Sequence, residues 1–154
     1  MLYRGVGKKT DAANGGKLVP KGTKVEVVAL CDGRWKANGT IIIGPTQSNI
    51  ARAHQLETGL YEGCGVSTSR SEKVAISFAT GGGFEEGFVY VIDEAKLVGA
   101  NIAAWEFTDP VAPHEQEVTL IPLDGKALPQ LIVVDKYEVT SEGVIVAKGL
   151  LRHA

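Results

Sequence analysis

Two acidic side chains one residue apart form the first group that could do chemistry. Glu115 and Glu117 flank Gln116 within residues 115–121, whose composition predicts a β-strand. Side chains two apart on a strand share a face, so the carboxylates would lie roughly 7 Å apart. Such a pair repels itself, which is costly unless a ligand or cation uses it. One acid could stabilise positive charge while the other takes a proton. Alternatively, both could be solvated acids on an edge strand without a catalytic role.

Three consecutive hydroxyl side chains form the second group. Ser67, Thr68 and Ser69 lie where a short extended segment meets the start of a helix. Ser69 and Glu72 have the spacing of a capping box, so we expect Ser69 to cap that helix. Ser67 lies too early to act as a cap. It is therefore available to hydrogen-bond another group.

A single arginine within an apolar strand forms the third group. Arg4 lies in the predicted strand 2–6 and needs an anion, either a protein carboxylate or a ligand phosphate. The order of the three groups is more specific than any group alone. The sequence does not indicate a Rossmann or P-loop nucleotide site, because it has no strand–GxGxxG–helix unit. It does not indicate a serine hydrolase, because it has no G-x-S-x-G. Its three histidines and two cysteines lack the spacing of a zinc site.

Composition places these groups in an ordinary globular chain. The sequence has 154 residues, 44% of them hydrophobic and 22% charged, which predicts one domain over residues 1–154. No apolar run is long enough to span a membrane, and the N-terminus does not resemble a signal peptide. We expect Cys31 and Cys64 to be free thiols rather than a disulfide.

Charge is divided unevenly along the chain. The net charge is −2, but the first 40 residues hold eight Lys or Arg and only three Asp or Glu. This basic third could face the phosphates of a ligand or an acidic partner, or it could be a solvated surface without a role. The overall balance is not that of a basic nucleic-acid binder.

The elements that must position these side chains follow from periodicity and turn signals. Residues 7–22 and 94–113 are expected to be mostly loop. Strands are expected at 2–6, 24–27, 65–68, 87–93, 115–121, 131–139 and 144–151, a hairpin at 34–43, and helices at 46–58 and from 69 to about 80. Helices that cluster in the middle of the chain, with strands dominating its second half, favour an α+β fold with antiparallel pairing over a doubly wound sheet.

The three groups occur in an order that resembles the arginine-serine-glutamate class of mono-ADP-ribosyltransferases. The resemblance is greatest to the catalytic subunits of cholera toxin and the heat-labile enterotoxins. It spans roughly residues 2–120. The matching pieces are Leu2-Tyr3-Arg4, Gly16-x-Leu18-x-Pro20-x-Gly22, Thr58-Gly59, residues 65–69, residues 89–92 and Pro113-His114-Glu115-Gln116-Glu117-Val118.

The resemblance implies a split β-sandwich with a central NAD-binding cleft and helices in the N-terminal half. Arg4 and the adjoining Gly5 would bind NAD, with Arg4 on a phosphate and the neighbouring ribose. Ser67 would orient the catalytic glutamate, and Thr68 would support the site. Glu117 would bind the nicotinamide ribose and stabilise the positive charge that develops on it.

The resemblance also implies how the acceptor is handled. Glu115 would orient or deprotonate the acceptor. Trp105 and Phe107 would contact a macromolecular target, or both rings would simply lie in the core. Phe84 could lie over the nicotinamide. No metal is expected. Family members that modify DNA bases usually have glutamine at the first acidic position, so Glu115 favours a protein arginine as acceptor.

The expected function is therefore that of a toxin or effector domain that transfers ADP-ribose from NAD to a protein arginine. It would be secreted or injected and act in the cytoplasm of a target cell. An immunity protein is an expected partner; a membrane and a pentameric carrier are not. Two alternatives stay open: the same fold acting on nucleic acid or as an NAD glycohydrolase, and a non-catalytic binding module.

Overall fold

The computed structural model describes residues 1–20, 64–107 and 112–147, which form two compact units. The described residues of the first unit are 1–18, 68–100 and 128–147, and those of the second are 19–20, 64–67, 101–107 and 112–127. Predictions that concern Cys31, the strand at 24–27, the hairpin, the helix at 46–58 and residues 148–151 lie outside the described part. The single-domain expectation stays a prediction.

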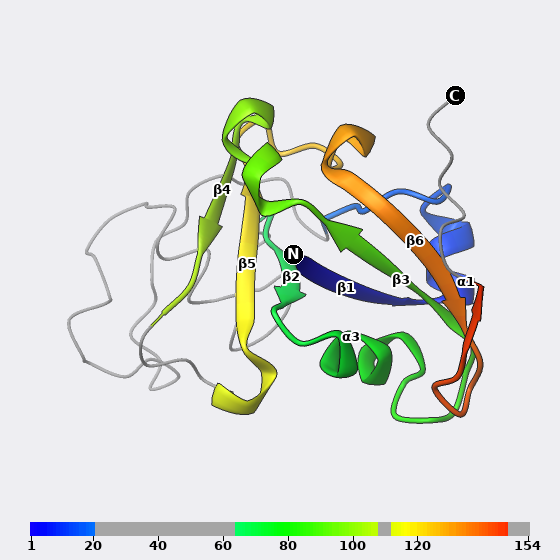
Figure 1. Cartoon of the computed structure of the whole chain (residues 1–154). Coiled ribbons are helices and arrows are strands. Elements are labelled where there is room, and N and C mark those ends of the chain that lie inside the picture. Colours follow the sequence, from blue (N-terminus) through cyan, green and yellow to red (C-terminus); the bar gives the residue numbers. More distant parts are fainter. Residues whose placement is uncertain (21–63, 108–111, 148–154) are drawn as a thin grey trace, which may run out of the picture. The chain divides into compact units, whose positions relative to one another are not determined.

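The described residues contain seven strands, two α-helices and several short 3-10 turns (Figure 1). The strands are β1 (Leu2–Gly7), β2 (Val66–Ser69), β3 (Gly87–Ile92), β4 (Ile102–Trp105), β5 (Glu117–Pro122), β6 (Val133–Val139) and β7 (Ile145–Ala147). The helices are α1 (Lys8–Ala13) and α3 (Glu72–Ala79), and the 3-10 turns are η2 (Glu94–Lys96), η3 (Val98–Ala100), η4 (Pro113–Glu115) and η5 (Gln130–Ile132).

The first unit is built on strands in the order β2-β1-β3-β6-β7, where β2 contributes its last two residues. β1 and β3 are antiparallel over their whole length, from Leu2 opposite Ile92 to Gly7 opposite Gly87. β3 pairs in the same sense with β6, and β6 with β7. The predicted strands at 2–6, 65–68, 87–93 and 131–139 are confirmed within two residues at each end.

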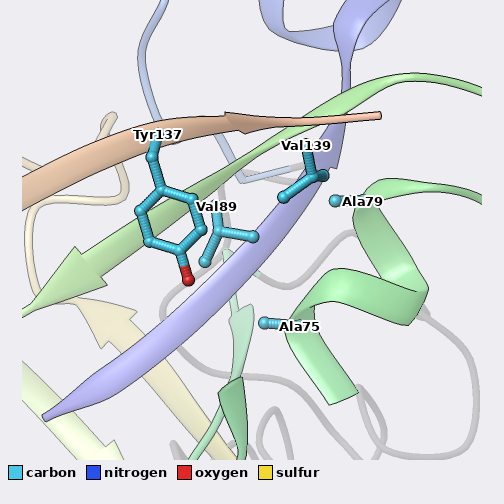
Figure 2. Packing of buried hydrophobic residues seen from close by; sticks show 5 residues of the cluster. All are labelled: Ala75, Ala79, Val89, Tyr137 and Val139. Carbon is cyan, nitrogen blue, oxygen red and sulfur yellow. The ribbon is translucent and has the colours of Figure 1, made fainter. Parts of the chain in front are cut away.

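Helix α3 packs its small side chains against the sheet. Figure 2 shows Ala75 and Ala79 on the side of α3 that faces Val89 and Tyr137, and all four are almost fully buried. Gly5 lets the helix come this close: a Cβ there would lie 1.8 Å from the carbonyl oxygen of Ala75. Any side chain at that position would force strand and helix apart.

The start of α3 differs from the predicted capping box. Ser71, not Ser69, is the N-cap, and its hydroxyl accepts a hydrogen bond from the Val74 N–H at 3.3 Å. Ser69 ends β2 opposite Tyr3, and its hydroxyl accepts a hydrogen bond from the Ser71 N–H at 3.0 Å. The expectation for Ser69 was therefore wrong because this residue is held by strand pairing.

Two elements were missed by the sequence patterns. α1 lies within 7–22, which was expected to be loop; its N-cap, Gly7, has no side chain to supply the usual start signal. Asp11 is the buried residue of this short helix. β4 lies within 94–113, also expected to be mostly loop, and it is a strand because it pairs along its full length with β5.

The second unit contains β4 and β5, with the first two residues of β2 next to β5 in strand order. The pairing of β4 and β5 is antiparallel, from Ile102 opposite Pro122 to Trp105 opposite Thr119. Cys64 and Ile121 form a small buried cluster here. Cys64 is a free thiol, as expected. No helix in the described ranges is both long and apolar enough to cross a membrane.

Candidate active site

Glu117 opens β5 and is held by a neighbour on the same strand face. The Thr119 hydroxyl donates a hydrogen bond of 2.8 Å to Oε2 of Glu117. Thr119 is completely buried, whereas Glu117 is partly exposed. The hydroxyl therefore anchors the carboxylate at the edge of the core. Our sequence reasoning missed Thr119, although the Glu-x-Thr spacing on a strand would have suggested the contact.

Glu115 does not lie on the strand, so the predicted same-face geometry of the two acids was wrong. Glu115 ends η4, and Gln116 has a left-handed backbone with φ of 47° before β5 begins at Glu117. Pro113 begins this 3-10 turn, and the left-handed residue breaks the strand alternation. The Glu115 side chain is about one-third exposed, with Oε1 at 4.0 Å from Nε2 of His114.

Trp105 lies on the same face as Glu117 and Thr119. It is directly opposite Thr119 in the β4–β5 register, which makes it a diagonal neighbour of Glu117. Its ring stacks on Phe107 with centroids 6.2 Å apart and an interplanar angle of 23°. Both rings pack against the buried cluster of the second unit yet are only partly buried themselves. Trp105 ends a strand, although the segment was expected to be loop.

Ser67 and Thr68 lie at the centre of β2. In strand order β2 is next to β5 in the second unit and next to β1 in the first. Ser67 is partly buried and Thr68 is buried. β2 pairs with β1 through Tyr3 and Ser69. Carrying this antiparallel register one residue further sets Thr68 opposite Arg4.

Arg4 lies in the middle of β1 and is partly buried. Its direct partner on β3 is Tyr90, so the two side chains share a face of the sheet. Gly5, the next residue, is required for the close approach of α3 described above. Packing against α3 therefore explains why residue 5 is a glycine, independently of any ligand.

Phe84 lies on the turn between α3 and β3 and is 92% exposed. The turn is well ordered by hydrogen bonds: the N–H groups of Gly83, Phe84 and Glu85 all donate to the carbonyl oxygen of Thr80 at 2.8–3.1 Å. These hydrogen bonds hold the backbone of the turn, and the Phe84 ring lies in solvent. Whether it covers a nicotinamide stays a prediction.

The candidate residues fall into the two units as two groups. Strand order and register bring Ser67, Trp105 and Glu117 onto adjacent strands of the second unit, with Glu115 on the preceding turn. Arg4, Gly5 and Thr68 lie on adjacent strands of the first unit. A shared NAD site stays a prediction. The described residues show no cluster of His, Cys, Asp and Glu that could hold a metal ion.

Solved structures of heat-labile enterotoxin share this fold. A double cysteine mutant has 22% identity and a TM-score of 0.50, with 94% of this chain and 58% of that chain covered. An E. coli enterotoxin mutated at a buried residue has 21% identity and a TM-score of 0.51, covering 95% and 72%. An arginine-to-lysine mutant has 18% identity and a TM-score of 0.51, covering 99% and 74%.

These likenesses confirm the expected α+β fold with antiparallel strands. The chain spans 58% of the first of these enterotoxin chains and so corresponds to a part of it. No curated protein sequence matches the chain. A family model, NarE, matches residues 1–120, which are most of the chain. The chain therefore belongs to the NarE family, a family of ADP-ribosyltransferases.

Proposed function

We propose that this chain transfers ADP-ribose from NAD to an arginine of a target protein, with release of nicotinamide. The observation that carries the proposal is the Glu117 carboxylate, anchored by the buried Thr119 hydroxyl on the strand face that also holds Trp105. ADP-ribosyltransferases use NAD as their substrate. A fixed carboxylate suits cleavage of the bond to nicotinamide, and a nearby aromatic ring suits recognition of the acceptor protein.

Glu117 serves the first part, cleavage of the N-glycosidic bond. As that bond breaks, its electron pair leaves with nicotinamide and positive charge develops on the ribose. A carboxylate that is already held in place stabilises this charge without reorganising during the reaction. The 2.8 Å hydrogen bond from Thr119 supplies that fixed orientation. Ser67, on the strand next to β5, is proposed to orient Glu117 further.

Glu115 serves the second part, attack by the acceptor. A guanidinium must lose a proton to become a nucleophile, and a carboxylate can take it. Glu115 lies one residue before Gln116 on the turn that leads into β5, so a different element carries it from the one that carries Glu117. This separation of the two acids supports the proposal that each has its own role.

The first unit is proposed to bind NAD. Arg4, with its planar fork of donors, suits the diphosphate, and Gly5 and Thr68 lie beside it on β1 and β2. Phe84 is proposed to shield the nicotinamide from water.

Trp105 and Phe107 are proposed to recognise the target protein. Stacked aromatic rings that are partly exposed are common anchors for protein partners. We further propose that the chain acts as a secreted or injected effector in the cytoplasm of a target cell. An immunity protein would then protect the producing cell.

Labelled NAD tests the acceptor directly. A cell lysate is incubated with adenylate-labelled NAD and the protein, and the products are digested with protease or with nuclease. The proposal is supported if protease releases the label from large molecules and if neutral hydroxylamine removes it, as expected for an arginine adduct. Nuclease-sensitive label would show a nucleic-acid acceptor, and free ADP-ribose alone would show NAD hydrolysis; either result would overturn the protein-arginine assignment.

A further inference from the structure

A buried ionic cluster lies on the sheet face that α1 covers in the first unit. Asp11 of α1 is 6% exposed. Its Oδ1 accepts a hydrogen bond from the Tyr90 hydroxyl, and its Oδ2 accepts one of 2.9 Å from Nζ of Lys136. The same Nζ lies 4.6 Å from the ring centroids of both Phe88 and Tyr90.

The partners of Asp11 make its burial tolerable. A buried carboxylate is costly unless it is both paired and hydrogen-bonded. Lys136 supplies the charge, and the two aromatic faces stabilise the ammonium in turn. Tyr90 supplies the second hydrogen bond: burial, and then the bond to Asp11, raise the pKa of the Tyr90 phenol, so it stays protonated and donates.

The strand register connects this cluster to Arg4. Tyr90 of β3 lies opposite Arg4 of β1 on one side and opposite Lys136 of β6 on the other. Directly opposed residues share a sheet face, so Arg4, Tyr90 and Lys136 form one row. Tyr90, which donates a hydrogen bond to Asp11, therefore lies between two cations, Arg4 and Lys136. Of these two, Lys136 forms the ion pair with Asp11.

We propose that Lys136 is a positioning residue, which neutralises Asp11 and so prevents this carboxylate from capturing the Arg4 guanidinium. The inference rests on the proposed function, in which Arg4 binds an NAD phosphate. Lys136 thus sets substrate affinity through Arg4 while it touches no part of the substrate.

The expected result of removing Lys136 is a change in NAD affinity. In Lys136→Met the unpaired Asp11 attracts Arg4 across Tyr90. Because a hydrogen bond to a charged group is involved, we expect the KM for NAD to rise about tenfold while kcat changes little. The double variant Asp11→Asn/Lys136→Met removes the competing charge, so its KM returns close to that of the parent.

A matched control separates this effect from a general loss of positive charge. Lys8→Met also removes one lysine that pairs with carboxylates in the first unit, but Lys8 and its partner Glu86 are both more than half exposed, so this ion pair is solvated. Its KM should stay at the parent value. A folded Lys136→Met with the parent KM, or a raised KM that Asp11→Asn does not restore, would overturn the inference.

A structural readout keeps the inference apart from the proposed function. The crystal structure of Lys136→Met should show the Arg4 guanidinium paired with Asp11, and this result does not depend on activity. If Lys136→Met does not fold, Lys136→Gln keeps a donor for Asp11 without the charge and should show the same pairing. An inactive parent protein would refute the proposed function, whereas an unmoved Arg4 in the variant would refute the inference.

Discussion

Removal of the Thr119 hydroxyl tests whether the orientation of Glu117 matters for catalysis. Thr119→Val replaces the hydroxyl with a methyl group of similar size in a completely buried position. The change deletes the 2.8 Å hydrogen bond to Oε2 of Glu117. A hydrogen bond to a charged group contributes about 1.5–3 kcal/mol, and about 1.4 kcal/mol corresponds to a factor of ten in rate. We therefore expect kcat to fall about tenfold to a hundredfold.

The KM for NAD separates an effect on the transition state from a loss of binding. Since Glu117 is proposed to act on charge that develops as the bond breaks, the KM should change little. Nicotinamide release measured over a range of NAD concentrations gives both constants. Thr119→Ser keeps the hydroxyl and is the matched control, expected to retain most of the parent kcat. A Thr119→Val variant that is folded and has the parent kcat would refute the reasoning.

Three further predictions concern the other candidate residues. Arg4→Lys keeps the charge but loses the planar fork, so the KM for NAD should rise more than kcat falls; an unchanged KM would indicate a structural ion pair instead. Glu115→Gln should abolish transfer to the acceptor while slow NAD hydrolysis continues, and equal loss of both would contradict separate roles. Gly5→Ala should destabilise the fold by about 3 kcal/mol or more, measured by urea unfolding, because its Cβ would overlap Ala75; a parent-like midpoint would show that α3 moves away at no cost.

The elements that could be predicted from the sequence are those with a strong local pattern. β1 and β3 are short runs rich in β-forming residues, and both were predicted within one residue at each end. The order of the arginine, hydroxyl and acidic groups also identified the family before any geometry was known. These signals succeed because each is contained within a few neighbouring residues.

The features that escaped prediction depend on contacts that are distant in the sequence. α1 has no capping side chain, and its only buried residue, Asp11, is accommodated by Lys136, which is 125 residues away. Glu115 was placed on the strand because a left-handed Gln116 has no strong sequence signal. β4 is recognisable only from its pairing with β5. Local patterns cannot report such partners.

The catalytic role of Glu117 is the central claim, and nicotinamide release from NAD by the parent protein and by Glu117→Gln tests it most directly. The variant keeps the shape of the side chain and removes its charge, so it should fold and bind NAD much as the parent does. We expect its rate to fall on the order of a hundredfold or more, since a preorganised charge is lost from the transition state. Equal rates for a folded variant and an active parent would show that Glu117 is not catalytic.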